Sequence, residues 1–168
     1  MKIRCVLFDR DGTLGGLADE RYPETFSPYC PIGGVFAELK ARGYTVGIIT
    51  NQSSIARGTG AGYAFDREFA SYGADLWEIC PHDSGDNCEC RKPGSGMLRA
   101  VMEKTGYRAE EIVLVGDRLA DLQCAAGVGA MGILVRTGRG KDEEKIVRET
   151  YLKAPILDRF DEILNLLD

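Results

Sequence analysis

The chain has 168 residues, of which 44% are hydrophobic and 28% are charged, and its formal net charge is -5. This length and composition predict one globular domain over residues 1–168, large enough to bury about two-thirds of the surface of the unfolded chain. The acidic balance lacks the basic footprint of a nucleic-acid-binding protein. No apolar run approaches the length of a signal-peptide core or a membrane span, so we expect a cytoplasmic protein with neither a membrane nor a nucleic-acid partner.

Strands and helices are predicted to alternate along the sequence. Apolar runs predict strands at residues 3–8, 45–49, 76–79, 112–115 and 132–135. Helices are predicted around residues 35–39 with a stop at Gly43, at 64–72, at 94–105 with a stop at Gly106, up to residue 126, at 141–153, and at 159–167 with Asp158 as N-cap. This alternation predicts an α/β fold, a Rossmann-like parallel sheet with helices on both faces. The irregular connection at residues 15–31 is too short for a separate cap domain.

The first predicted strand ends at two carboxylates. Asp9 and Asp11 lie two residues apart, and because side chains alternate along an extended strand, both project to the same side. Such a pair is tolerated when a cation lies between the carboxylates or one of them keeps a proton, which predicts a Mg²⁺-assisted nucleophile and an acid/base partner. An ordinary acidic turn is the alternative. A calcium loop is excluded, since Leu14 occupies the sixth position, where an EF-hand counted from Asp9 requires Gly, although Glu20 matches the Glu of the twelfth.

Polar side chains also follow the second and fourth predicted strands. Residues 50–54 read Thr-Asn-Gln-Ser-Ser, and residues 116–121 contain Asp117 and Asp121. Ligands of parallel α/β sheets bind beyond the carboxyl ends of the strands, so these segments are expected to share one site with Asp9. His82 is the single histidine of the chain, and if it binds a metal, carboxylates must carry the reaction.

Four soft metal ligands lie within eleven residues, at Cys80, His82, Cys88 and Cys90. Three thiolates and one imidazole are enough to close a tetrahedral structural Zn²⁺ site with no open position. In a reducing compartment this spacing favours a zinc-stapled loop at residues 80–90 over scattered thiols. We expect this zinc to hold a loop that is poor in apolar residues, and so to position the adjoining Arg91 and Lys92.

Four segments follow one another along the chain: Asp9-Arg10-Asp11-Gly12-Thr13, Thr50-Asn51, Lys92-Pro93 and Gly116-Asp117-x-x-x-Asp121. Their order is that of the four motifs of the haloacid dehalogenase superfamily of phosphohydrolases, which the sequence resembles over nearly its full length. More narrowly, residues 50–58, 80–82 and 88–93 look like the bacterial D-glycero-D-manno-heptose-1,7-bisphosphate 7-phosphatases and the related histidinol-phosphate phosphatases.

The resemblance implies a reaction mechanism. Asp9 would attack phosphorus to form an aspartyl-phosphate, while Asp11 would protonate the leaving oxygen and later activate water. Mg²⁺ would be bound by Asp9, the backbone carbonyl of Asp11 and Asp117. Thr50 and Lys92 would hold the oxygens of the phosphoryl group being transferred.

A small phosphorylated metabolite is the implied substrate, and we expect a monomer to bind it. Arg91 and Arg118 would hold a second, remote phosphate, or else are solvated surface charges. Asp121 either tunes the site through hydrogen bonds or caps the following helix. Five polar residues are predicted to contact the substrate: Asn51, Gln52, Ser53, Arg91 and Arg118.

Three functions stay open at this point. Residues 54–58 and 135–138 look like the heptose enzymes, which places heptose bisphosphate first. The spacing from His82 to Cys88 is closer to that of the histidinol-phosphate enzymes, and Gly15 and Arg118 depart from the usual heptose pattern. An inactive zinc-stapled protein that binds a phosphorylated ligand is the third possibility, but a binder has no need of two adjacent carboxylates that repel phosphate.

Overall fold

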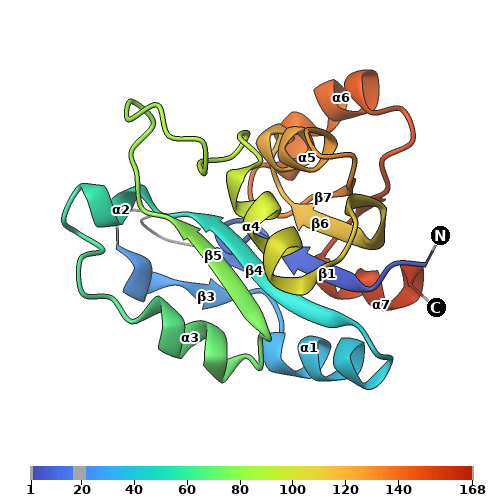
Figure 1. Ribbon diagram of the computed structural model, residues 1–168, viewed down its shortest axis with the longest axis horizontal. Coiled ribbons are helices and arrows are strands. Elements are labelled where there is room, and N and C mark those ends of the chain that lie inside the picture. Colours follow the sequence, from blue (N-terminus) through green and yellow to red (C-terminus); the bar gives the residue numbers. More distant parts are fainter. Residues whose placement is uncertain (1, 17–21, 168) are drawn as a thin grey trace.

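The computed structural model of the chain describes residues 2–16 and 22–167. Its centre is a six-stranded parallel sheet in the order β5-β4-β1-β6-β7-β8 (Figure 1). The strands are β1 Cys5–Phe8, β4 Thr45–Asn51, β5 Leu76–Cys80, β6 Ile112–Gly116, β7 Met131–Val135 and β8 Ile156–Leu157. The α/β prediction and all five predicted strands are confirmed. The sequence did not reveal β8, because two residues are too few to show a periodicity.

Helices cover both faces of the sheet, as predicted (Figure 1). One face carries α1 Ile32–Ala41, α3 Phe65–Ser71 and α7 Ile163–Leu166. The other carries α4 Gly96–Thr105, α5 Leu119–Ala126 and α6 Gly140–Thr150. A short helix, α2 Ser53–Ala56, follows β4 and was not predicted.

Strand β1 lies in the middle of the sheet and contributes side chains to a hydrophobic core on each face. Its side chains alternate, so Val6 and Phe8 pack in the core beneath α1 and α3, whereas Cys5 and Leu7 pack in the core beneath α4 and α5. All four residues are fully buried, as expected for a strand covered on both faces. Burial fixes the strand register, and with it the positions of the polar residues that follow.

The connection between β1 and α1 contains a second, small pair of strands. Strand β2 Gly15–Gly16 pairs antiparallel with β3 Ser27–Pro28, and a 3₁₀ turn at Pro23–Thr25 lies between them. Residues 17–21 of the predicted irregular connection lie outside the described residues. Within the described part, this segment forms a small hairpin and no second domain.

The predicted C-terminal helix at residues 159–167 is only partly correct. A 3₁₀ turn at Phe160–Glu162 comes first, and α7 occupies a single turn after it. The prediction that Asp158 is the N-cap is wrong: Arg159 holds that position, and the Asp158 carboxylate accepts a hydrogen bond of 2.7 Å from Arg136. The guanidinium of Arg136 draws this carboxylate away from the turn. No described helix has the length and apolar composition that a membrane crossing requires.

Candidate active site

The carboxyl ends of three neighbouring strands meet at one cavity of about 460 Å³. Asp9 directly follows β1, Asn51 ends β4 and Asp117 directly follows β6, so the central part of the sheet supplies its floor. Most of the predicted site residues line it: Asp9, Asp11, Asn51, Gln52, Ser53, Arg91, Lys92, Asp117, Arg118 and Asp121. Thr50 lies just beneath, at 1% exposure. The structure therefore brings together the polar strand ends that the sequence places far apart.

Lys92 connects two of the buried carboxylates. Its Nζ lies 2.9 Å from Asp9 Oδ1 and 2.6 Å from Asp121 Oδ1, and it donates to the Ile49 carbonyl at 3.1 Å. Burial opposes the charge of the ammonium group, but the carboxylates of Asp121 and Asp9 outweigh burial and raise the pKa of Lys92. Lys92 is therefore a fixed cation next to Asp9.

Asp9, Asp117 and Asp121 form a buried group that fits a divalent cation. One carboxylate oxygen from each lies within 4.8 Å of the others. Burial and the charges of Asp9 and Asp121 together raise the pKa of Asp117 to about 8. A hard cation with oxygen ligands such as Mg²⁺ would remove this repulsion, so the donor set suits that ion.

The loop at residues 137–139, which follows β7, holds Asp117. Arg139 donates its backbone N–H to Asp117 Oδ2 at 2.9 Å, and the Thr137 hydroxyl donates to the Gly12 carbonyl at 2.7 Å. Gly12 has a φ of +88°, and a Cβ at this position would lie 2.1 Å from Asp117 Oδ2. Glycine is therefore required here by both the backbone conformation and the close approach.

Asp11 shares the strand end with Asp9, but its carboxylate contacts a different set of residues. Arg10 Nη1 donates to Asp11 Oδ1 at 2.7 Å, and Gln52 Nε2 donates to Asp11 Oδ2 at 2.7 Å. Burial raises the pKa of Asp11 and Arg10 opposes the shift, while Asp9 adds to it, and the result is a pKa of about 6. A carboxyl group with such a pKa that lines a cavity is suited to proton transfer.

The residues after Thr50 hold the site together. Asn51 Nδ2 donates to the Lys92 carbonyl at 3.1 Å, and the Lys92 N–H donates to Asn51 Oδ1 at 3.0 Å. Gln52 Nε2 also donates to Thr50 Oγ1 at 3.0 Å. Asn51 and Gln52 therefore have partners within the protein, although both line the cavity.

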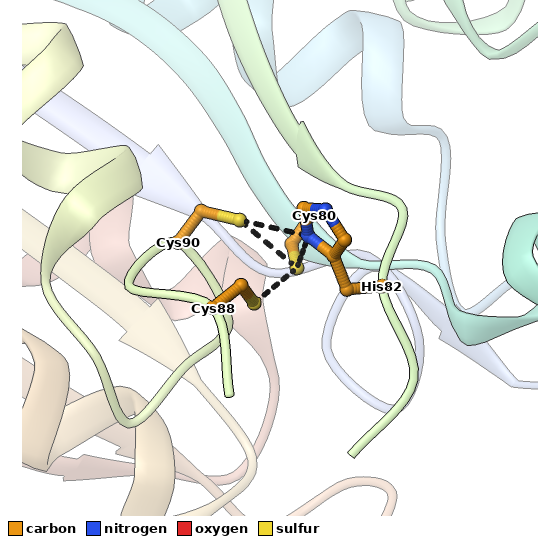
Figure 2. A group of neighbouring side chains, drawn as sticks. All are labelled: Cys80, His82, Cys88 and Cys90. Atoms are coloured by element: carbon orange, nitrogen blue, oxygen red, sulfur yellow. Dashed lines mark hydrogen bonds between the residues drawn. The ribbon is translucent and has the colours of Figure 1, made fainter. Parts of the chain in front are cut away.

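The four predicted soft ligands form one cluster beside this cavity (Figure 2). Four distances between their sulfur and Nδ1 atoms fall between 3.2 and 3.6 Å. Around a tetrahedral zinc with Zn–S of about 2.3 Å and Zn–N of about 2.0 Å, ligand atoms lie roughly 3.5–3.8 Å apart. The four distances lie within about half an ångström of these separations, and the donor set of three thiols and one imidazole suits Zn²⁺.

Both predicted arginines line the cavity, in different environments. Arg91 is half-buried, and its Nη1 donates to Ser53 Oγ at 2.7 Å and to the carbonyl of the cluster residue His82 at 3.3 Å. Arg118 is half-exposed, and its Nε lies 3.8 Å from a carboxylate oxygen of Glu143. The cluster loop therefore orients Arg91, whereas a single exposed ion pair holds Arg118 weakly.

Asp121 has both of the contacts that the sequence left as alternatives. Its Oδ1 accepts from Lys92, and its Oδ2 accepts the backbone N–H of Arg118, the N-cap residue of α5, at 3.1 Å. One carboxylate thus caps the helix and holds the active-site lysine.

Four charged residues of the site were missed, besides the uncharged Ser54, Pro93 and Ala120 that also line the cavity. Arg57 and Arg139 line the cavity, and an Arg10–Glu68 ion pair supports it from behind. The position of Arg10 between two aspartates, directly after a buried apolar run, was a signal that carboxylates surround this arginine. Glu68 carries no comparable signal, because it is an ordinary polar residue of a predicted helix.

Comparisons with known proteins agree with this site. A family model described as HAD-hydrolase-like matches residues 89–163. The D-glycero-beta-D-manno-heptose-1,7-bisphosphate 7-phosphatase of Pseudomonas putida is 39% identical, over 89% of this chain and 93% of that protein. The protein of the same name from Haemophilus influenzae is 37% identical, over 92% of this chain and 94% of its own.

Among solved structures, the fold is similar to the crystal structure of D,D-heptose 1,7-bisphosphate phosphatase from B. bronchiseptica in complex with magnesium and phosphate. The TM-score is 0.82 at 28% identity, covering 98% of this chain and 97% of that one. The chain belongs to the HAD-like hydrolase family, in the group that contains the bacterial heptose-1,7-bisphosphate 7-phosphatases. It is a phosphatase, and the resemblance seen in the sequence is confirmed.

Proposed function

We propose that the protein is a Mg²⁺-dependent phosphomonoester hydrolase that removes the 7-phosphate of D-glycero-D-manno-heptose 1,7-bisphosphate through an aspartyl-phosphate. The observation that carries the proposal is the Asp9 carboxylate on the cavity floor, 2.9 Å from Lys92 and grouped with Asp117. Relatives of that name at 39% identity support the substrate.

Asp9 is the proposed nucleophile. It lies on a buried strand end, so its carboxylate is fixed in place, and the adjacent Lys92 ammonium attracts the phosphoryl oxygens. Attack of a carboxylate oxygen on phosphorus forms the acyl phosphate as the bond to the leaving oxygen breaks. Asp11 gives its proton to that leaving oxygen, and as a carboxylate it then takes a proton from the water that releases phosphate.

Asp9, Asp117 and the backbone carbonyl of Asp11 are the proposed Mg²⁺ ligands. When bound, the ion neutralises charge between the phosphate and the nucleophile. The protein supplies the rest: the 137–139 loop holds Asp117, while Asp121 keeps Lys92 charged. Thr50, 1% exposed and hydrogen-bonded to Gln52, is proposed to donate to a phosphoryl oxygen. Asn51, Gln52 and Ser53 line the cavity and are proposed to contact the substrate.

The test of the function is phosphate release from heptose 1,7-bisphosphate, with histidinol phosphate as the competing substrate. Turnover is expected with Mg²⁺ and is expected to stop when the ion is chelated. A higher kcat/KM for histidinol phosphate would overturn the proposed heptose bisphosphate substrate. Binding of a phosphorylated ligand without Mg²⁺ and without any phosphate release would favour the inactive phospho-ligand-binding protein.

Arg91→Ala tests the remote phosphate. A charge-assisted contact is worth about 1.5–3 kcal/mol, so kcat/KM for heptose bisphosphate is expected to fall roughly ten- to hundredfold. A small monophosphate, which lacks the remote group, is expected to lose several-fold less. Steady-state kinetics on both substrates measures this difference.

The control for this variant is Arg99→Ala, which removes an exposed arginine that does not line the active-site cavity. It is expected to leave both rates unchanged. Equal losses on both substrates in Arg91→Ala would instead place Arg91 at the reacting phosphate or in loop structure.

We further propose that Cys80, His82, Cys88 and Cys90 hold one structural Zn²⁺ per chain. A closed thiolate site keeps its zinc through purification, whereas carboxylate-bound Mg²⁺ exchanges. Cys88→Ser is expected to lose the zinc and to lower the free energy of unfolding by more than about 3 kcal/mol. Elemental analysis and urea unfolding measure the two effects.

Cys30→Ser is the matched control, because Cys30 is a partly buried free thiol outside the cluster. Its zinc content is expected to match that of the unmodified protein. A folded preparation without zinc would contradict the structural role.

The single domain over residues 1–168, the monomeric state and the cytoplasmic location remain predictions from the sequence.

A further inference from the structure

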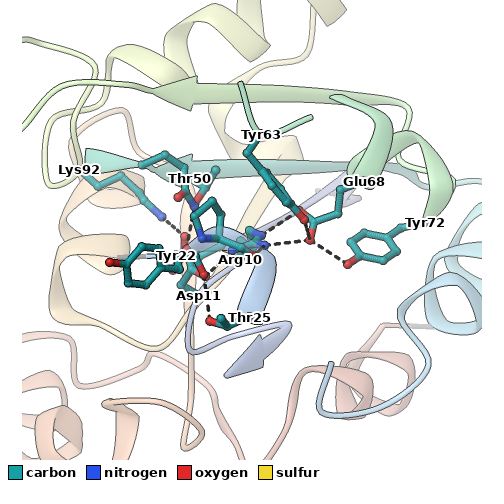
Figure 3. A network of polar contacts seen from close by, with 12 residues as sticks. Arg10, Asp11, Tyr22, Thr25, Thr50, Tyr63, Glu68, Tyr72 and Lys92 are labelled. Carbon is teal, nitrogen blue, oxygen red and sulfur yellow. Dashed lines mark hydrogen bonds and ion pairs between the residues drawn. The ribbon is translucent and has the colours of Figure 1, made fainter. Parts of the chain in front are cut away.

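Arg10, between the two active-site aspartates, is completely buried. Its Nε and Nη2 donate to Glu68 Oε2 and Oε1 at 2.8 and 2.9 Å, and its Nη1 donates to Asp11 Oδ1 at 2.7 Å. Nη2 also donates to the Pro23 carbonyl at 2.8 Å, and the Phe26 ring lies 4.1 Å from the guanidinium. Figure 3 shows Arg10 between Asp11 and Glu68. Arg10 thus connects the β2–β3 hairpin, helix α3 and the strand end.

Arg10 contacts two carboxylates, those of Glu68 and Asp11, although one would neutralise its charge. Burial of a guanidinium costs several kcal/mol unless a carboxylate accompanies it, and one carboxylate is enough. Here Glu68 forms the bidentate pair, and it accepts further hydrogen bonds from Tyr72 at 3.2 Å and Tyr63 at 3.4 Å. Glu68 therefore satisfies and orients the arginine, and Asp11 receives a guanidinium N–H whose direction is already set.

Arg10 contacts the Asp11 carboxyl from the side that faces away from the active-site cavity. Arg10 and Glu68 do not line the active-site cavity, whereas Asp11 does. Arg10 thus contacts the Asp11 carboxyl from its buried side and fixes its plane without occupying the space that a substrate needs. Gln52 contacts the second oxygen from the cavity side. Rotation of the Asp11 carboxyl would break a charge-assisted hydrogen bond to a group that is itself immobile.

We propose that Arg10 and Glu68 form a positioning pair, in which Glu68 of α3 holds the guanidinium and the guanidinium fixes the Asp11 carboxyl in the orientation from which it protonates the leaving oxygen. The inference rests on the proposed function, because it takes Asp11 as the acid. It assigns to α3, a helix outside the family motifs, a part in the protonation step.

The test is the dependence of kcat/KM on the leaving group in Glu68→Gln. kcat/KM reports phosphoryl transfer to Asp9 and excludes the later hydrolysis of the intermediate. β-Glycerophosphate has a basic alkoxide leaving group that needs the acid, whereas p-nitrophenolate leaves without a proton. We expect kcat/KM to fall roughly tenfold or more for β-glycerophosphate and less than about twofold for p-nitrophenyl phosphate, because misplacing the acid forfeits part of a 10²–10⁴-fold contribution.

Glu144→Gln is the matched control, since Glu144 accepts the same bidentate pair of N–H groups from Arg136 at a site that does not line the cavity. It is expected to leave both kcat/KM values within twofold. Equal losses on the two substrates in Glu68→Gln, or no loss, would overturn the proposal, since a purely structural pair has no preference for a leaving group.

Glu68→Asp decides the case if Glu68→Gln does not fold, because it keeps the charge but shortens the side chain, and the same leaving-group pattern is expected. If neither variant folds, the pair serves stability alone and the proposal fails. Asp11→Asn, measured on the same two substrates, separates the two levels of inference. If Asp11→Asn lowers kcat/KM equally on both substrates, Asp11 is not the acid and the proposed function is wrong at that step. If Asp11→Asn mainly affects β-glycerophosphate but the folded Glu68 variants do not, Asp11 is the acid and only the positioning pair is wrong.

Discussion

Asp9→Asn is expected to abolish phosphate release, by at least about a thousandfold in kcat, while the protein stays folded. The amide keeps the shape of the carboxyl group but is too weak a nucleophile to form the aspartyl-phosphate. The fold is expected to survive because Asp121 still pairs with Lys92 at 2.6 Å, and because the substitution removes one charge from a crowded acidic group. Phosphate release from β-glycerophosphate and a thermal melt measure the two effects.

A chemical trap strengthens this experiment. The unmodified protein, quenched in acid during turnover of labelled substrate, is expected to carry phosphate on Asp9, and the variant none. Asp161→Asn is the control, since it removes another ion-paired aspartate far along the chain, at the Arg159 contact. If Asp9→Asn retained turnover, the covalent scheme would be wrong.

Lys92→Met is expected to lower both stability and activity. Without its ammonium group, Asp9 and Asp121 lose their cation in an environment where both are buried. Breaking a buried pair by removing one partner costs about 3–5 kcal/mol, so urea unfolding of the metal-free protein is expected to shift by that amount. Activity is expected to fall about a hundredfold or more, because a fixed charge on the phosphoryl oxygens is lost.

Two further variants separate these effects. Lys104→Met removes an exposed lysine that pairs with Glu78, and is expected to change neither stability nor activity appreciably. The double variant Lys92→Met with Asp121→Asn is expected to recover part of the stability and none of the activity, since it relieves the repulsion without restoring the charge. Full stability in Lys92→Met alone would mean that the buried carboxylates are neutral without the lysine.

The strand ends explain how much of the site the sequence predicted. Buried runs such as Val6–Phe8 and Val113–Val115 read clearly as strands, and in a parallel sheet their ends must meet at one edge. Asp9 and Asp117 could therefore be placed at one site with no structure. The spacing of Cys80 and Cys88 likewise carried its own signal, because metal ligands cluster within short loops.

Other contacts had no local signal. Arg10 and Glu68 are 58 residues apart, and no periodicity relates them. The roles of the predicted substrate contacts depend on side-chain rotamers, which the sequence does not determine. Asn51, for example, forms two hydrogen bonds with the backbone of Lys92, and the Thr50-Asn51 motif gives no sign of them. Asp158 failed as an N-cap for the same reason: a distant arginine competes with the local backbone for the carboxylate.

The 137–139 loop has a consequence for protein synthesis. Thr137 contacts the Gly12 carbonyl across 125 residues of sequence, and Arg139 supplies the backbone N–H that holds Asp117. A growing chain thus carries Asp9 and Asp11 through most of its translation without the groups that complete their surroundings. Loop closure over such a span comes late in folding. Truncated or ribosome-bound chains that end before this loop would therefore be inert toward cellular phosphate esters, and hydrolysis would begin only with the nearly finished polypeptide.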